Sequence, residues 1–203
     1  MRLCSVVLLL VVVNGGAAFA QEPAAVGVKA GVNFANLNFE GEGATVNFDQ
    51  RTGFVGGLFV VWPASSRLAL QTEVLYSQKG AKIEEDEATG KIKFDYVDVP
   101  VLARVSTPAS GGTAFHLFAG PSFGFRVSAK SEATFEGEEE SEDLDDEVER
   151  FDLGLVAGAG LQFGRFEIDG RYTWGLTNLN KDEEDEGLKI KNRVFSIMAG
   201  IRF

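Results

Sequence analysis

Cysteine is almost absent from this chain of 203 residues, since its single copy, Cys4, lies close to the N-terminus. Disulfide bonds within the chain and thiolate metal sites after residue 4 are therefore excluded. Histidine also occurs once, so His116 alone offers a side chain that titrates near neutral pH. The net charge of −11 disfavours nucleic acid as a partner, because its phosphates would be repelled.

A hydrophobic run long enough for a membrane-spanning helix is also missing. Arg2, the apolar residues 6–13 and the small residues around 18–20 predict a cleavable signal peptide over residues 1–20, with a retained N-terminal helix as the alternative. Cleavage would leave residues 21–203 as one domain with 30 acidic and 18 basic residues, a net charge of −12. If this domain sits in a membrane, it must do so as a closed β-barrel.

Glycine and phenylalanine are abundant instead, with 24 and 17 copies. Large apolar residues recur at every second position in many segments. The clearest example is the C-terminal segment 193–203, where Phe195, Ile197 and Ile201 alternate with Ser196 and Met198. Such alternation predicts a strand, because a helix would scatter both sets around its axis.

The same alternation recurs along the chain and predicts eight strands. They cover residues 26–35, 51–62, 67–77, 92–105, 113–127, 151–163, 165–176 and 193–203. Long acidic loops follow the odd-numbered strands and short turns follow the even ones, so neighbouring strands should be antiparallel. The sequence thus predicts an all-β fold, an eight-stranded antiparallel up-and-down transmembrane β-barrel preceded by a cleavable signal peptide. Both chain ends should lie at the rim of short turns.

The fourth of these strands is irregular. Ile92 and Phe94 occupy even positions, whereas Val97 and Val99 occupy odd ones, and this predicts a bulge near Tyr96. Pro100 is unfavourable within this strand, because it cannot donate a hydrogen bond to a neighbouring strand.

The charged face should point into the barrel and the apolar face toward lipid. Many glycines lie on the charged face, as the narrow interior of an eight-stranded barrel requires. Aromatic residues on the apolar face lie near strand ends, where the membrane interfaces should be. Six cations and five anions should neutralise one another inside: Lys29, Arg51, Arg104, Arg126, Arg171 and Arg202 with Glu73, Asp98, Asp152, Glu167 and Asp169. The opposite orientation, that of a secreted, soluble, lipocalin-like ligand-binding barrel, is the alternative.

Several segments resemble one known family. They are residues 27–33 (Gly-Val-Lys-Ala-Gly-Val-Asn), 96–102 (Tyr-Val-Asp-Val-Pro-Val-Leu), 118–124 (Phe-Ala-Gly-Pro-Ser-Phe-Gly) and the terminal Phe203. Together they make the chain similar to the small bacterial outer-membrane β-barrels called porin-family or PorT-like proteins, with the architecture of OmpA-type and OmpX-type barrels. The resemblance implies location in the outer membrane of a Gram-negative-type bacterium and recognition of Phe203, as a C-terminal assembly signal, by the barrel assembly machinery. It implies no shared enzymatic activity, and it makes a proline in the fourth strand ordinary.

Two features, His116 and the acidic loops, contain groups that are typical of catalytic or metal-binding sites. His116 begins the fifth strand next to a short turn, at the periplasmic end, where a structural polar role inside the barrel is favoured over catalysis. Of the 30 carboxylates, 23 fall in the four long loops, and weak divalent-cation binding is conceivable only in the densest runs. The candidates are Asp143, Asp145, Asp146, Asp182 and Asp185, although neither run has the spacing of an EF-hand loop and a solvated charge run is favoured.

These observations predict an integral outer-membrane protein without enzymatic activity or cofactor. We expect a monomer with periplasmic termini, whose acidic extracellular loops serve a structural or surface-interaction role. Its expected partners are outer-membrane lipid or lipopolysaccharide and, during biogenesis, the assembly machinery. A narrow porin-like channel for small cationic solutes is the alternative among membrane barrels.

Overall fold

The computed structural model describes residues 23–40, 49–85, 88–135, 138–143, 149–179 and 189–203. Within these ranges the secondary structure consists of β-strands. Their bounds are β1 Ala25–Glu40, β2 Asp49–Pro63, β3 Leu68–Glu85, β4 Ala88–Ser106, β5 Thr113–Phe135, β6 Glu138–Asp143, β7 Phe151–Phe163, β8 Phe166–Gly175 and β9 Lys189–Arg202. The predicted signal peptide, residues 1–20, lies outside the described residues.

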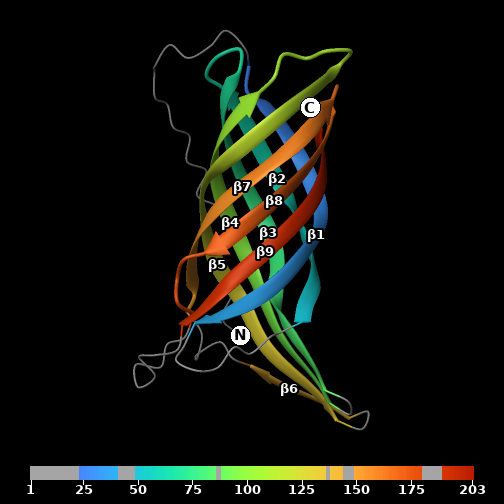
Figure 1. The fold of residues 1–203 in the computed structure, drawn as a ribbon, viewed down its shortest axis with the longest axis vertical. Helices are drawn as coiled ribbons and strands as arrows, with labels where there is room; N and C mark the ends of the chain where they lie inside the picture. Colours follow the sequence, from blue (N-terminus) through green and yellow to red (C-terminus); the bar gives the residue numbers. More distant parts are fainter. Residues whose placement is uncertain (1–22, 41–48, 86–87, 136–137, 144–148, 180–188) are drawn as a thin grey trace, which may run out of the picture.

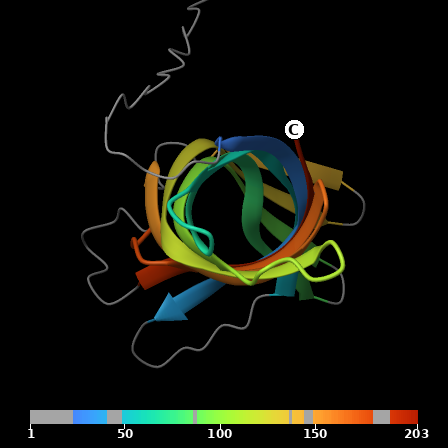
Figure 2. The same cartoon turned by 90° about the horizontal axis from the view of Figure 1, so that it is seen from above.

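Eight of the strands close into a barrel (Figure 1). Hydrogen bonding follows the order β4-β3-β2-β1-β9-β8-β7-β5, and an additional pairing between β4 and β5 completes the ring, which Figure 2 shows from above. Every pairing is antiparallel. The predicted eight-stranded antiparallel barrel is therefore confirmed.

The two rims of the barrel differ. Short turns join β2 to β3, β4 to β5 and β7 to β8 at the upper end of Figure 1. The last strand ends at this rim as well, because the Phe203 amide donates to the Val26 carbonyl, 2.9 Å away. Both ends of the barrel thus lie on the short-turn side, as predicted.

The opposite, long-loop rim is extended by strands rather than by irregular loops. β1, β3 and β5 run on for five to eight residues beyond the predicted strands, and β6 pairs with the end of β5. The predicted loops over 79–91 and 128–150 are in this respect wrong. Acidic composition suggested solvated loops, but adjacent strands here satisfy one another's backbone groups outside the apolar band.

The bulge predicted near Tyr96 is present, but its assignment to the fourth strand is wrong. In β4 the even residues Phe94, Tyr96 and Asp98 are all buried, so the alternation continues without a slip. The irregularity lies in the partner strand, where pairing passes from Asp95↔Ser128 to Tyr96↔Arg126 and leaves Val127 unopposed. Ile92 and Phe94 are apolar at inward positions because they contribute to an apolar cluster at the end of the lumen.

Burial decides which face points inward. Large apolar side chains are exposed on all eight barrel strands, for example Val28, Leu58, Val74, Val105, Leu117, Leu155, Ile168 and Ile197. Charged residues such as Lys29, Glu73, Arg104 and Arg171 on the same strands are buried inside. This orientation overturns the lipocalin-like alternative, which requires the reverse. None of the described residues forms a helix with the length and apolarity that a membrane crossing demands.

Candidate functional site: the filled lumen

A buried charge cluster occupies the lumen on the short-turn side of its middle. Lys29 of β1 lies 3.0 Å from Glu73, 3.3 Å from Glu167 and 2.9 Å from Asp169, measured from its Nζ to the nearest carboxylate oxygen. Arg171 of β8 contacts the same Glu73 with both terminal nitrogens, at 2.6 and 3.1 Å. The strands alternate strictly, so charges that lie up to 140 residues apart in sequence converge on one axis.

Two further arginines complete this central charge cluster. Arg104 and Arg202 both contact the Oε2 atom of Glu167, at 3.2 and 2.7 Å. The cluster holds four cations (Lys29, Arg104, Arg171, Arg202) and three carboxylates (Glu73, Glu167, Asp169). Such mutual pairing is what permits burial of so many charges.

His116 lies beside this cluster and is buried. The Arg104 guanidinium lies 2.9 Å from the His116 Nδ1 atom, and because arginine can only donate, Nδ1 must accept. The imidazole stacks on Phe118 and lies so close to Gly160 that a Cβ there would come within 2.4 Å of it. His116 is therefore packed closely among Arg104, Phe118 and Gly160 inside the barrel.

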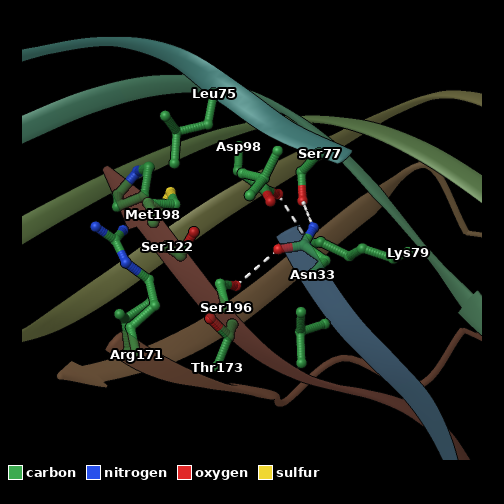
Figure 3. A pocket seen from close by; sticks show the side chains of 14 residues that line it. Asn33, Leu75, Ser77, Lys79, Asp98, Ser122, Arg171, Thr173, Ser196 and Met198 are labelled. Atoms are coloured by element: carbon green, nitrogen blue, oxygen red, sulfur yellow. Dashed lines mark hydrogen bonds and ion pairs between the residues drawn. The ribbon is translucent and has the colours of Figure 1, made fainter. Parts of the chain in front are cut away.

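A neutral polar layer fills the middle of the lumen (Figure 3). The Asn33 amide donates to the Ser77 hydroxyl at 2.9 Å, and the Ser196 hydroxyl donates to the Asn33 carbonyl oxygen at 2.7 Å. The cavity between these side chains and Met198 measures about 20 Å³. That volume accommodates about one water molecule.

A second charge cluster, the loop-side charge cluster, lies between this layer and the long-loop rim. Lys79 Nζ contacts Asp98 at 2.9 Å and Asp152 at 3.9 Å, and it lies 4.3 Å from the centre of the Tyr96 ring. Asn192 donates to Asp152 at 2.7 Å. Sequence reasoning missed Lys79 and placed it in a loop, although it continues the odd-numbered inward series of Glu73 and Ser77.

An apolar plug closes the lumen at the long-loop end. Its buried members come from β1, β3, β4, β5 and the segment after β8: Leu37, Ala81, Phe94, Tyr96, Ala129 and Leu179. The backbone of Leu179 is held in place, since its amide donates to the Ile190 carbonyl and its carbonyl accepts from the Glu149 amide. The lumen is thus occupied by two charge clusters, a polar layer and this plug in succession.

The structure distributes the eleven predicted interior charges over three settings. Seven form the central charge cluster, and Asp98 and Asp152 belong to the loop-side charge cluster. Arg51 donates to the Lys79 carbonyl, and Arg126 donates to the Glu149 carbonyl at 3.3 Å. These two arginines thus bind backbone oxygens near the long-loop rim.

The predicted cation ligands are mostly beyond the described part of the chain. Asp145, Asp146, Asp182 and Asp185 lie outside it, and Asp143 ends β6 opposite Lys130. Among the described residues no group of three His, Cys, Asp or Glu side chains is placed to hold a metal ion.

Comparisons with known proteins address the family and the fold. The model of the family described as "Outer membrane protein beta-barrel domain" matches residues 19–181. No curated protein matches the chain significantly. Among solved structures, the attachment invasion locus protein Ail of Yersinia pestis is 19% identical, with a TM-score of 0.45, and the match covers 90% of this chain and 100% of Ail. Neisserial surface protein A is 12% identical, with a TM-score of 0.47 and coverage of 90% and 100%. The outer membrane enzyme PagL is 14% identical, with a TM-score of 0.45 and coverage of 86% and 98%.

Proposed function

Because this chain belongs to the outer membrane protein β-barrel domain family, we propose that it is a closed, non-enzymatic barrel with a structural and surface-interaction role. Family membership places it in the outer membrane of a Gram-negative bacterium. In this proposal it is a monomer whose termini face the periplasm and whose long, acidic loops face outward. The assembly machinery and outer-membrane lipid are its proposed partners.

One observation carries this proposal: buried charged, polar and apolar side chains occupy successive levels of the described lumen. Its middle retains a cavity of only about 20 Å³, and the charges on either side are bound to one another. A solute would have to displace ion pairs in two clusters and the apolar plug. Each buried pair that lost one partner would cost about 3–5 kcal/mol.

The experiment is single-channel recording of the refolded protein in planar bilayers. A filled lumen gives no stable step-like current, whereas a narrow cation channel gives discrete conductance steps that reverse at the cation equilibrium potential. Such steps in a preparation that migrates as a single folded, heat-modifiable band would overturn the closed-barrel proposal.

The absence of enzymatic activity is supported by the surroundings of His116. The imidazole is buried against Phe118 and Gly160, and Arg104 donates to its Nδ1 atom. We therefore expect the lipid A of cells that produce the protein to match the lipid A of cells that lack it. A modification of lipid A that disappears in His116→Ala would contradict this part of the proposal.

The orientation in the membrane has its own test. No cysteine follows Cys4, so a single introduced thiol can be labelled selectively. In intact cells a membrane-impermeant maleimide should label Gln50→Cys, at the exposed start of β2, and leave Ala109→Cys, in a short turn, unlabelled. The reverse pattern would place the long-loop rim in the periplasm.

A further inference from the structure

A groove on the outside of the barrel has a chemical character different from the apolar wall around it. It lies on the β8–β9–β1 face at the long-loop end and has a volume of about 290 Å³. We call it the interfacial groove, and Phe34, Asn36, Asn38, Tyr172, Arg193 and Phe195 form most of its lining.

Strand register orders these residues into two levels. Phe195 of β9 lies between Tyr172 of β8 and Phe34 of β1, and its ring stacks on Phe34 with 6.3 Å between ring centres. The next outward-facing level toward the long-loop rim has Arg193 between Trp174 and Asn36. The outward-facing pair of β1 and β9 therefore changes from two aromatic residues, Phe34 and Phe195, to an amide and a cation, Asn36 and Arg193.

Arg193 is held at this boundary rather than extended into solvent. Its Nη1 atom donates to the Gly175 carbonyl at 3.0 Å, and the residue is half-buried. Lys191, two residues away on the same outward face, lies opposite Asn38. Two cations on one short stretch of wall contrast with the net charge of −11 of the whole chain.

We propose that the interfacial groove binds the phosphate-bearing headgroup of an anionic lipid in the surrounding leaflet. A guanidinium offers a planar fork of donors that matches phosphate oxygens. On the side of Arg193 toward the middle of the barrel, the exposed Phe195 is followed by the exposed Ile197. The lipid's acyl chains can therefore lie along this apolar surface. This continuity with the apolar surface selects a lipid over a water-soluble phosphate.

The position of the groove along the barrel axis also favours a lipid headgroup. Aromatic side chains mark the boundary between hydrocarbon and headgroups in outer-membrane barrels, and cations that follow them lie at phosphate level. Assignment of this lipid to the outer leaflet rests on the orientation in the proposed function. Headgroup binding itself does not, because it can be measured in a symmetric bilayer.

The test uses Trp174 as a reporter beside Arg193. The chain has two tryptophans, so Trp62→Phe leaves Trp174 alone. Its fluorescence is measured in phosphatidylcholine bilayers that contain brominated phosphatidic acid or, separately, brominated phosphatidylcholine. Quenching gives the relative association constant of the two lipids at the groove. We expect a preference for phosphatidic acid of about fivefold, the effect of one basic residue near an anionic surface.

Three variants test whether Arg193 causes the preference for phosphatidic acid. Arg193→Ala should abolish the preference, Arg193→Lys should retain part of it, and Arg67→Ala, in a short turn at the opposite rim, should retain all of it. Heat-modifiable gel migration checks that each variant is a closed barrel. Equal quenching by both lipids, or a preference that survives in folded Arg193→Ala, would overturn the inference.

Inorganic phosphate separates the two possible sources of the anion. Added at the ionic strength of a chloride control, it should reduce the preference no more than chloride does. A selective loss in phosphate would reassign the groove to a free anion and overturn lipid binding. A conducting barrel with an intact preference would refute only the proposed function, whereas a closed barrel without a preference would refute only this inference.

Discussion

Lys29 Nζ lies 3.0 Å from Glu73 Oε1 inside the barrel, and neither side chain is accessible to solvent. Arg171 donates to both oxygens of the same carboxylate. Glu73 therefore neutralises two cations at once, and the centre of the lumen depends on it more than on any surface ion pair, since exposed pairs contribute at most about 1 kcal/mol.

Replacement of Glu73 by glutamine should destabilise the barrel strongly. The substitution keeps the shape of the side chain but leaves Lys29 and Arg171 short of one buried negative charge, a loss of about 3–5 kcal/mol. Urea-induced unfolding in lipid vesicles, followed by tryptophan fluorescence, measures the free energy of unfolding. Arg67→Ala, at an exposed turn position, serves as the control and should change it by less than about 0.5 kcal/mol. Equal stability of both variants would contradict the structural role of the central charge cluster.

Close backbone approach explains the glycine at position 31. A Cβ on Gly31 would lie 2.0 Å from the Ile197 carbonyl oxygen, whereas a Cβ on Gly170 would have no neighbour within 4 Å. Gly31→Ala should therefore destabilise the barrel by about 1–3 kcal/mol, because the backbone of β9 must move. Gly170→Ala should be neutral or slightly stabilising, because alanine restricts the unfolded chain. The same unfolding assay compares the two, and a neutral Gly31→Ala would show that the strands separate more easily than their register suggests.

Phe203 should matter for assembly more than for stability. Its side chain is 75% exposed, while its backbone amide holds β1 through the Val26 carbonyl. Phe203→Ala keeps that hydrogen bond but removes the terminal aromatic ring. We expect a reduced fraction of heat-modifiable protein in the outer membrane of cells, with unchanged unfolding in vitro.

Phe166→Ala is the matched control for assembly. Phe166 is 62% exposed at the same rim, and it lies opposite Ile201, close to the chain end. Its replacement should leave assembly in cells intact. If both variants assembled equally well, a terminal signal at Phe203 would be refuted.

Much of the barrel could be predicted because lipid outside and charge inside impose a period of two. Lys29, Glu73 and Arg171 could be assigned to the inner face because they alternate with apolar residues, and their convergence followed from the closure of the sheet. The exact partners could not be predicted, because period-two patterning fixes the face of a residue but not its height relative to other strands. Strand register sets that height, and the register differs for each pair.

The sequence was least informative at the long-loop rim. There the membrane no longer constrains the outward face, so the apolar Phe94 points inward while the polar Lys93 and Asp95 point outward, the reverse of the pattern in the apolar band. Lys79 was missed because it begins a charged segment, residues 79–91, whose composition is typical of a loop. The interfacial groove likewise depends on Tyr172, Phe195 and Phe34 meeting across three strands, which the sequence alone does not specify.

The last prediction tests the apolar face itself. Leu58 is 57% exposed and lies opposite Val74, near the middle of the apolar band. In a lipid bilayer Leu58→Arg should lower the free energy of unfolding by about 2–4 kcal/mol, because arginine is then placed in hydrocarbon. Thr52→Arg, at an exposed outward position near the long-loop rim, should cost only about 0–1 kcal/mol. In a protein that exposed this face to water, both substitutions would be close to neutral, so equal and small effects would show that Leu58 does not contact lipid.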